Sequence, residues 1–344
     1  MPEIASLSLW PALGVLGAAA MVIVFAGSRL AGVADELADR TGMGEIIAGA
    51  VFVGGATSLP GAIASMTTAA DGYAQLSIGN AVGGLLAQTM FLVIADLAYR
   101  RANLEHAAAS VTGLAQGVLL VSLLTIPLLA FSAPEVTWLG VHPASIVMVA
   151  GYGLGLRLLA SIKQDPMWSP VQTDETRSDI DEVEEGPHKR SNRRLWTLFA
   201  LYAALTAAAG YAVGEASIPL VDASGLSESA VGTLITGVAN SLPELVTAIA
   251  AVRQGAPNLA VGDIIGGNSF EVLFLAAADV FYREGSIYHA FEQDNVFTVM
   301  SAILMTGVLL LGMLARERQG VISIGFESAI VFGIYLGSAA ILLV

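Results

Sequence analysis

Long apolar stretches recur along the whole chain and are separated mostly by short polar connections. The hydrocarbon core of a bilayer is about 30 Å thick, so a helix needs about 20 apolar residues to cross it. Only 13% of the residues are charged, against about 25% in soluble domains. The sequence therefore predicts an all-α integral membrane protein of about ten transmembrane helices. The expected spans are residues 10–28, 44–70, 74–98, 108–131, 142–162, 195–213, 228–252, 257–282, 295–315 and 321–343.

One connection is much longer than the others and divides the chain. Residues 163–194 are polar and charged and contain proline. We therefore expect a first five-helix half at 1–162, a linker at 163–194 and a second five-helix half at 195–344. The acidic composition of the linker is typical of a solvated, flexible segment. Its acidic residues include Asp174, Glu175, Asp179, Asp181, Glu182, Glu184 and Glu185.

The basic residues indicate how the chain crosses the membrane, because Lys and Arg accumulate in cytoplasmic loops. If the N-terminus is placed outside, Arg283 is the only one of the 15 Lys and Arg residues that falls outside. We therefore expect both termini outside and the linker in the cytoplasm, in a prokaryotic plasma membrane. Met1–Trp10 contains Glu3 and no basic residue, which favours a retained first helix over a cleavable signal peptide.

The composition excludes several kinds of chemistry. The chain has no cysteine, which removes disulfides, zinc–thiolate sites and thiol redox motifs. Its 4 histidines do not favour a histidine metal site, and neither H-E-x-x-H nor Gly-x-Ser-x-Gly occurs. We therefore expect no enzyme, no cofactor and no nucleic-acid partner, and we expect inorganic cations and the lipid bilayer as partners.

Two segments of the chain repeat each other. Residues 45–97 align with 228–280 at a constant offset of 183 and without a gap. Five expected spans separate corresponding points, and this odd number makes the second copy cross the membrane in the opposite sense. Inverted repeats are typical of secondary transporters, whose binding sites lie near the bilayer midplane where the repeats meet. The identical pairs are Gly49/Gly232, Gly54/Gly237, Ser58/Ser241, Leu59/Leu242, Pro60/Pro243, Gly72/Gly255, Gly79/Gly262, Gly83/Gly266, Gly84/Gly267 and Asp96/Asp279.

Each repeat has a proline near the middle of an expected helix, Pro60 in the first and Pro243 in the second. A proline inside a helix leaves the carbonyl four residues earlier without its donor, and these carbonyls belong to Ala56 and Ala239. A group freed in this way must find another partner in lipid. Hard cations prefer oxygen ligands, so we interpret these segments as candidate cation sites. Further side-chain oxygens beside the prolines come from Thr57, Ser58, Asn240 and Ser241.

Three carboxylates lie within the expected spans of the second repeat. Glu244 follows Pro243 directly, and an ionisable group at this depth is a candidate functional residue. Asp263 and Glu271 are eight residues apart, so they share one face of their helix. Their counterparts in the first repeat, Asn80 and Gln88, are amides. Glu271 is also open to a purely structural role, as a buried hydrogen-bond partner of Gln88 or Asn268.

Four further acidic residues lie at the ends of the expected repeat helices. We expect Asp96 and Asp279 to lie at the membrane interface and not to bind ions. Glu45 and Glu228 open their helices, where a negative charge is stabilised by the helix N-terminus. We interpret these two glutamates as caps or entrance residues.

The motifs of both repeats resemble the α-repeats of the calcium/cation antiporter superfamily, which includes sodium/calcium exchangers. The second repeat carries Asn240-Ser-Leu-Pro-Glu244 and Gly262-Asp-Ile-Ile-Gly-Gly-Asn-Ser-Phe270, and the first carries Ala56-Thr-Ser-Leu-Pro60 and Gly79-Asn-Ala-Val-Gly-Gly84. The resemblance implies alternating access and exchange of Ca²⁺ for Na⁺. It also implies Glu244 and Asp263 as metal-binding carboxylates, with further oxygens from Thr57, Ser58, Asn80, Asn240 and Ser241.

The first repeat departs from the family pattern at one position. A glutamate is expected after Pro60, and this chain has Gly61. The resulting site is asymmetric, which should weaken divalent binding or favour a monovalent cation or a proton. We offer the hypothesis that Glu271 partly replaces the missing carboxylate. A monovalent cation/H⁺ exchanger, a channel, an intramembrane enzyme and a non-transporting degenerate homologue are the alternatives to Na⁺/Ca²⁺ exchange.

Overall fold

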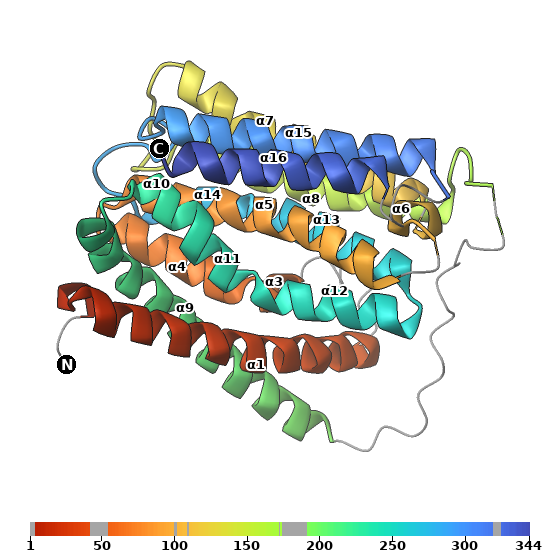
Figure 1. The fold of residues 1–344 in the computed structure, drawn as a ribbon, viewed down its shortest axis with the longest axis horizontal. Coiled ribbons are helices and arrows are strands. Elements are labelled where there is room, and N and C mark those ends of the chain that lie inside the picture. The colour runs from red at the N-terminus through yellow and green to blue at the C-terminus, as the bar shows by residue number, and fades with distance from the viewer. Residues whose placement is uncertain are drawn as a thin grey trace.

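The structure is a computed structural model that describes residues 4–41, 54–99, 102–108, 110–171, 173, 191–318 and 325–344. Within these residues the chain is almost entirely helical, and its one β pairing is an isolated bridge between Trp138 and Val141. The helices, drawn in Figure 1, are η1 (Ile4–Ser6), α1 (Leu9–Thr41), α3 (Gly54–Thr57), α4 (Leu59–Ala70), α5 (Ala74–Tyr99), α6 (Leu104–Ala107), α7 (Val111–Ser132), α8 (Pro143–Gln164), α9 (Asn192–Ser224), α10 (Glu228–Val231), η3 (Gly232–Thr236), α11 (Gly237–Asn240), α12 (Leu242–Gln254), α13 (Pro257–Glu271), α14 (Leu273–Phe281), α15 (Gln293–Ala315) and α16 (Phe326–Leu342).

The described helices account for the ten expected spans. Seven of them are long and apolar enough to cross a membrane alone, with α13 and α14 counted together, and α10–α12 form an eighth span that is bent. α16 has 17 residues, and α3 with α4 belongs to the second expected span. The first part of that span, including Glu45, lies outside the described residues, as do residues 174–190 of the linker.

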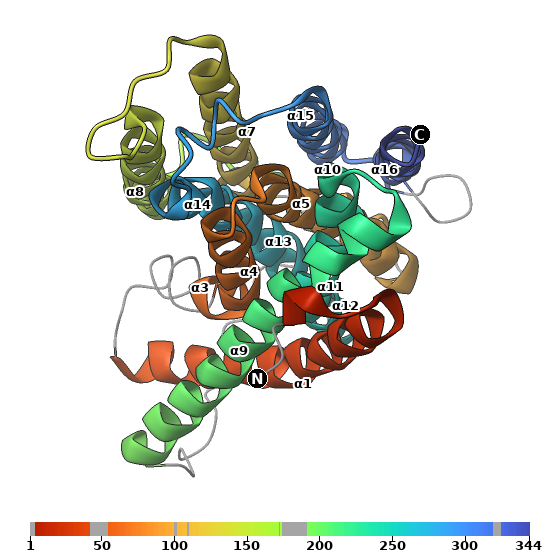
Figure 2. The same cartoon turned by 90° about the vertical axis from the view of Figure 1, so that its left-hand side faces the viewer.

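Two helices are longer than the sequence pattern predicted. The expected spans 10–28 and 195–213 are parts of α1 and α9, each of 33 residues. These helices pack along each other at one edge of the bundle (Figure 2). A helix longer than the bilayer thickness tilts or extends beyond it, so hydropathy located the spans but underestimated both helices.

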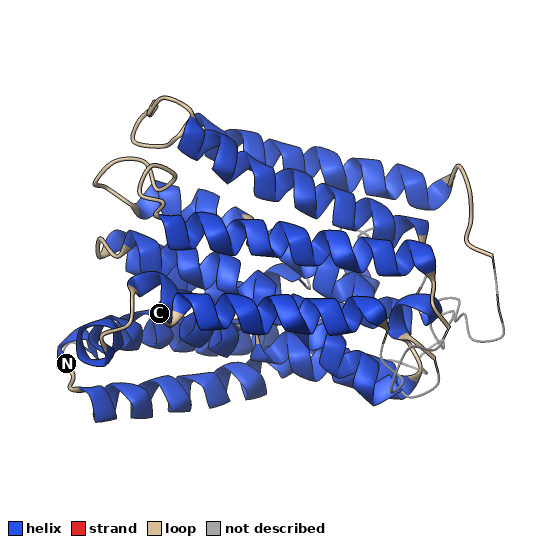
Figure 3. Ribbon diagram, turned by 45° about the horizontal axis from the view of Figure 1, so that its top comes forward, coloured by secondary structure: helices blue, strands red, loops and turns tan. Residues whose placement is uncertain are grey.

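The centre of the bundle is built from the two repeats. Figure 2 shows α4, α5, α10–α12 and α13–α14 in the middle, with α1 and α9 on one side and α7, α8, α15 and α16 on the other. Large apolar side chains on the outer helices are exposed, among them Trp10 at 79% and Met21 at 70%. An exposed apolar surface on helices of this length is typical of helices that face lipid. Both described ends of the chain lie at the same end of the bundle (Figure 3).

The offset of 183 extends from the sequence into the contacts. Asp96 accepts hydrogen bonds from Leu104 N, Gly325 N and Ser328 Oγ. Asp279 accepts them from the three residues at the same offset. These donors are Ile287 N, His142 N and Ser145 Oγ.

Each aspartate thus accepts one hydrogen bond from its own half of the protein and two from the other half. Asp96 and Asp279 are 1% and 0% exposed, so both carboxylates are buried inside the protein near the ends of their helices. Buried backbone amides at loops need acceptors, and these two carboxylates supply them.

The outer helices obey the same symmetry. Gly27 of α1 and Gly210 of α9 are 183 positions apart, and a Cβ atom at either would collide with Pro243 or Pro60, respectively. The α4–α5 and α12–α13 connections also match, because Gly72 and Gly255 adopt φ values of +87° and +83°. The two halves are therefore inverted copies of one five-helix unit.

Candidate functional site

The helices of the second and seventh expected spans are interrupted at equivalent serines. α3 ends before Ser58 and α4 begins after it, and α11 and α12 are separated in the same way by Ser241. The bend between Glu228–Asn240 and Leu242–Gln254 is 47°. Both breaks directly precede a Leu-Pro pair, as expected where proline removes a helical donor. A π-helical turn, η3, lies one turn before the second break, and such turns frequently accompany functional sites.

Glycines bring α5 into backbone contact with the broken seventh span. A Cβ atom on Gly79 would lie 2.9 Å from Ser229 O, and one on Gly237 would lie 2.6 Å from Gly84 N. A Cβ atom on Gly84 would lie 3.0 Å from Glu271 Oε2 and 3.1 Å from Ser241 Oγ. The glycines therefore allow close packing and leave space for polar groups between the helices.

Four side chains at these breaks form a hydrogen-bonded cluster with the repeat symmetry. Gln88 Nε2 donates to Glu271 Oε1 over 2.6 Å and to Ser241 Oγ over 3.3 Å. Ser58 Oγ donates to the same Glu271 oxygen over 3.1 Å. Gln88 and Glu271 are counterparts, as are Ser58 and Ser241. All four are buried, with exposed fractions of 0–4%. Glu271 therefore makes the structural contact with Gln88 that the sequence left open.

Glu244 lies beside this cluster and is 7% exposed. Neither of its carboxylate oxygens accepts a hydrogen bond of good distance and angle from the protein. Its charged neighbours are Glu271 and Asp263, and the Thr57 side chain lies next to it. Thr57 Oγ1 itself donates to Gly54 O over 3.0 Å. A buried carboxylate without donors is expensive and is compensated when a cation binds to it.

Two further buried oxygens, one on a member of the cluster and one on the residue before the second break, also lack hydrogen-bond donors. They are Gln88 Oε1 and Asn240 Oδ1. Together with the Glu244 carboxylate they offer four oxygen atoms, and the Glu271 carboxylate supplies a second negative charge. This composition, carboxylate and neutral oxygens without imidazole or thiolate, suits Na⁺ or Ca²⁺. Among the described residues no three or more His, Cys, Asp and Glu side chains form a metal-binding group, so the neutral oxygens are essential to such a site.

The place of the missing first-repeat glutamate is filled by other side chains. A Cβ atom on Gly61 would lie 2.9 Å from Phe274 Cε2 and 3.7 Å from Asn240 Cβ. Asn80 Nδ2 donates to Gly61 O over 2.9 Å, and Asn80 Oδ1 accepts from Asn240 Nδ2 over 2.8 Å. Asn80 is therefore used to connect α4 with α11, and the packed ring leaves no room for a side chain at Gly61.

No hydrogen bond joins Asp263 to the cluster among the described residues, although its charge acts on Glu244. Asp263 is an exposed residue. The charged group that acts on it is Asp35 of α1. Glu271, two turns further along α13, is 4% exposed. Ala56 and Ala239, whose carbonyls precede the two prolines by one turn, are both 6% exposed and lie next to the breaks. Gln88 and Phe274 were not predicted from the sequence as site residues, although the offset of 183 pairs Gln88 with Glu271.

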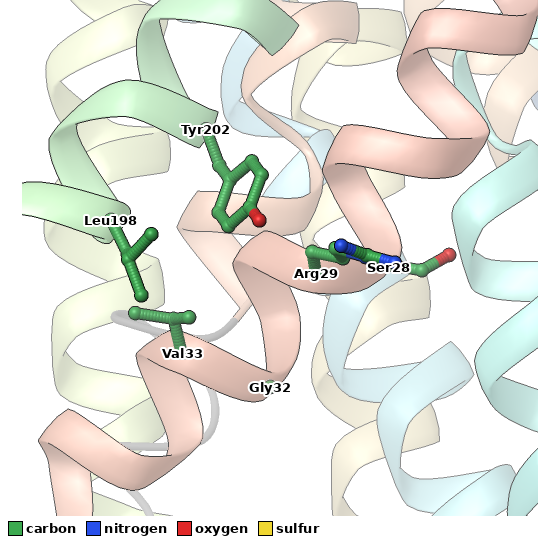
Figure 4. Close-up of a pocket in the computed structure, with 6 residues that line it drawn as sticks. All are labelled: Ser28, Arg29, Gly32, Val33, Leu198 and Tyr202. Atoms are coloured by element: carbon green, nitrogen blue, oxygen red, sulfur yellow. The ribbon is translucent and has the colours of Figure 1, made fainter. Parts of the chain in front are cut away.

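A surface recess of about 250 Å³ lies between α1 and α9 (Figure 4). No carboxylate lines this recess, and Arg29 supplies a positive charge to it while its guanidinium lies 4.3 Å from the centre of the Phe25 ring. It is therefore unsuited to cations and separate from the polar cluster. The lining residues are Ser28, Arg29, Gly32, Val33, Leu198 and Tyr202.

Comparison with known families identifies the chain. The model of the family described as "Sodium/calcium exchanger protein" matches residues 11–160 and 194–344, one segment in each half. The chain belongs to the sodium/calcium exchanger protein family. Members of this family are transporters. One relative is the sodium/calcium exchanger MaX1 of Methanosarcina acetivorans, which is 31% identical over 140 residues, or 39% of each chain.

Solved structures of exchangers share the fold of this family member. The crystal structure of the H⁺/Ca²⁺ exchanger CAX aligns with a TM-score of 0.65 at 14% identity, covering 96% of this chain and 85% of CAX. The sodium-calcium exchanger NCX_Mj aligns with a TM-score of 0.60 at 15% identity, covering 96% and 98%. The predicted resemblance and the predicted all-α inverted-repeat membrane fold are thus confirmed.

Proposed function

We propose that this exchanger-family protein exchanges Ca²⁺ for Na⁺ by alternating access at the site around Glu244. The observation that carries the proposal is that both oxygens of this buried carboxylate lack hydrogen-bond donors. Burial without a partner costs several kcal/mol, and a cation offsets that penalty. MaX1 and NCX_Mj, which are named as sodium/calcium exchangers, support the choice of ions.

The ligands that we assign to Ca²⁺ come from both repeats. Glu244, Gln88 and Asn240 supply the oxygens without donors, and Ser58, Ser241 and Glu271 supply oxygens already joined in the cluster. The two glutamates balance the charge of one Ca²⁺. Na⁺ competes for the same oxygens because both ions prefer oxygen ligands. Glu271 would thus provide the carboxylate that Gly61 does not.

The two breaks supply a route to alternating access. Each lies beside the cluster, one in each repeat, so opposite movements of the inverted halves would expose the same ligands to opposite sides. We also propose, from the distribution of Lys and Arg, that both termini are outside and the linker at 163–194 is cytoplasmic. Residues 1–162 and 195–344 would then be the two moving halves.

A vesicle assay tests the exchange. Purified protein is reconstituted in liposomes loaded with Na⁺, and calcium-45 uptake is followed after dilution into Na⁺-free buffer. We expect uptake by the unchanged protein and by Asp165→Asn, an exposed carboxylate at the end of α8, and a loss of at least about tenfold in Glu244→Gln. Equal uptake by Glu244→Gln would contradict the assignment of the site.

A proton-coupled exchanger is the second candidate. It is favoured by the placement of Glu244 and Glu271, two buried carboxylates that act on each other without a basic partner in the cluster. A carboxyl group in such a site can bind a proton in place of a cation. CAX, named as an H⁺/Ca²⁺ exchanger, has the same fold. Calcium uptake driven by a pH gradient in Na⁺-free vesicles would select this candidate, and a pH change with Na⁺ alone would select monovalent exchange. Silence in all three assays would indicate a non-transporting homologue.

A further inference from the structure

A second buried acidic group lies far from the central site, at the end of the bundle opposite the termini. Glu105 belongs to the short helix α6, and Glu327 lies in the first turn of α16. Figure 1 shows α6 at that end of the bundle. Glu105 and Glu327 are 1% and 0% exposed, and the neighbouring Asn103 is 2% exposed. Three polar side chains are therefore removed from solvent outside the proposed cation site.

Three buried oxygen atoms of this group have no hydrogen-bond donor. Asn103 Nδ2 donates to Glu327 Oε1. The other oxygen of Glu327 and Oε2 of Glu105 have no donor, and Asn103 Oδ1 has none. The two carboxyl groups are within hydrogen-bonding range of each other. Two carboxylates cannot donate to each other when both are ionised, whereas one shared proton satisfies both.

The other half of the protein shows that the fold does not require this acid pair. At the offset of 183, Glu105 corresponds to Tyr288 and Glu327 to Ala144. The equivalent junction there is held by Asp279 through its three donors, as Asp96 holds this one. The Tyr288 hydroxyl forms a hydrogen bond with Ser145. The two glutamates are thus an addition to a junction that is complete without them.

A glycine on the neighbouring helix α15 packs directly against Glu327. A Cβ atom on Gly312 of α15 would lie 2.8 Å from Glu327 Cβ. The counterpart of Gly312 in the first half is Leu129, whose side chain is 66% exposed. A larger residue at position 312 would exclude Glu327 from its buried place. Gly312 therefore provides the space in which the Glu327 side chain is buried.

Among the described residues, the charged groups that act on Glu105 are acidic. Asp96 of α5 and Glu327 are the charged groups that act on Glu105. His106 on α6 contacts Arg316 O and Thr173 through its two ring nitrogens. Arg316, at the end of α15, donates to Val171 O. Of the two following residues, Glu317 accepts from Phe326 N and Arg318 O accepts from Asn103 N. α13, which also packs against α6, carries Asp263 and Glu271.

We propose that Glu105 and Glu327 form a proton-binding site that is separate from the central cation site and holds one shared proton at neutral pH. The proton lies between the two carboxyl groups and joins α6 to the first turn of α16. Its loss places two negative charges, beside the charge of Asp96, in a space closed to solvent. The junction of α5, α6 and α16 is therefore weakened when the solution becomes alkaline.

The direction of the pKa shift agrees with this geometry. Burial, followed by the nearby Asp96 and Glu327 carboxylates, raises the pKa of Glu105 well above its ordinary value of 4.5. A group whose pKa is raised in the folded state binds more protons there than in the unfolded state. Its contribution to stability is complete below pH 4.5 and is lost as the pH rises through the folded-state pKa.

Two measurements on the full-length protein in detergent test the proposal. In the infrared spectrum at pH 7 we expect a protonated-carboxyl band that is lost in Glu105→Gln and kept in Asp165→Asn. Between pH 5 and pH 9 we expect the Tm of the unchanged protein to fall by at least about 3 °C more than that of Glu105→Gln. Glutamine keeps a donor toward Glu327, so this variant should fold.

Three results would overturn the proposal. The first is an infrared band that is unchanged in Glu105→Gln, and the second is an equal fall of Tm with pH in both proteins. The third is recovery of Tm at pH 9 on addition of Ca²⁺ or Na⁺ that depends on Glu105, because the occupant would then be a metal ion. If Glu105→Gln does not fold, Glu327→Gln replaces it, with a reduced fall of Tm with pH expected and an unreduced fall overturning the proposal.

Discussion

Gln88 and Glu271 occupy the same position in the two repeats, and they face each other at the centre of the protein, with Gln88 Nε2 2.6 Å from Glu271 Oε1. Inverted repeats related by a twofold pseudo-axis bring counterparts together only near that axis. The hydrogen-bonded pair therefore marks the axis. The difference between amide and acid at this one pair gives the central cluster its asymmetric charge.

Exchanging the two side chains tests whether the negative charge of Glu271 contributes to Ca²⁺ binding. Glu271→Gln should weaken Ca²⁺ binding by at least about tenfold, which is about 1.4 kcal/mol, because one balancing charge is lost. The double exchange Gln88→Glu with Glu271→Gln restores one acid and one amide to the pair. We expect it to recover most of the lost affinity in a calcium-45 binding assay.

The single variant Gln88→Glu serves as the comparison for this experiment. It adds a third carboxylate beside Glu244 and Glu271, so binding should become more dependent on pH, with affinity falling at acidic pH as protons compete for the acids. If Glu271→Gln binds Ca²⁺ as tightly as the unchanged protein, the hypothesis that Glu271 replaces the missing glutamate is wrong.

Phe274 should control whether a second-span glutamate can be introduced. Gly61→Glu alone places its Cβ 2.9 Å from the Phe274 ring, and overpacking of this kind costs about 1–3 kcal/mol. Gly61→Glu combined with Phe274→Ala removes the obstruction. We expect a lower Tm for the single variant and, for the double variant, partial recovery of Tm with tighter Ca²⁺ binding. A single variant as stable as the unchanged protein would show that the ring moves aside freely.

The contact between α5 and η3 predicts a strong effect of a single methyl group. A Cβ atom on Gly83 would collide with the backbone of Thr233, which cannot move without shifting the helix. Gly83→Ala should therefore lower Tm by several degrees, corresponding to about 1–3 kcal/mol.

Gly262→Ala is the matched control, because no atom lies within 4 Å of its added methyl group. Alanine is favoured over glycine in a helix by up to about 1 kcal/mol, so this variant should be unchanged or slightly more stable. Equal effects of the two substitutions would contradict the tight packing of α5 against η3.

Hydropathy and the constant offset of 183 were enough to predict the membrane fold and its inverted halves, because lipid-facing helices and repeated motifs leave direct signals in sequence. The lengths of α1 and α9 were missed, since both helices continue beyond their most apolar windows. The burial of Asp96 and Asp279 was missed because their amide donors come from loops and, in part, from distant helices.

The central site was only partly accessible from sequence. Ser58, Asn240, Ser241 and Glu244 lie within two residues of the Leu-Pro pairs, so their proximity followed from the repeat. Helix periodicity grouped Asp263 with Glu271, whereas Glu271 lies in the hydrogen-bonded cluster and Asp263 is exposed. The filling of the space at Gly61 by Phe274 depends on packing between distant helices, which no local pattern predicts.

Equilibrium calcium-45 binding to the purified protein, with and without Na⁺, tests the central claim most directly. We predict saturable binding that Na⁺ displaces, a loss of at least about tenfold in Glu244→Gln, and unchanged binding in Asp165→Asn. Equally tight binding by Glu244→Gln, or binding that Na⁺ does not affect, would contradict a Na⁺/Ca²⁺ site built around the carboxylate of Glu244.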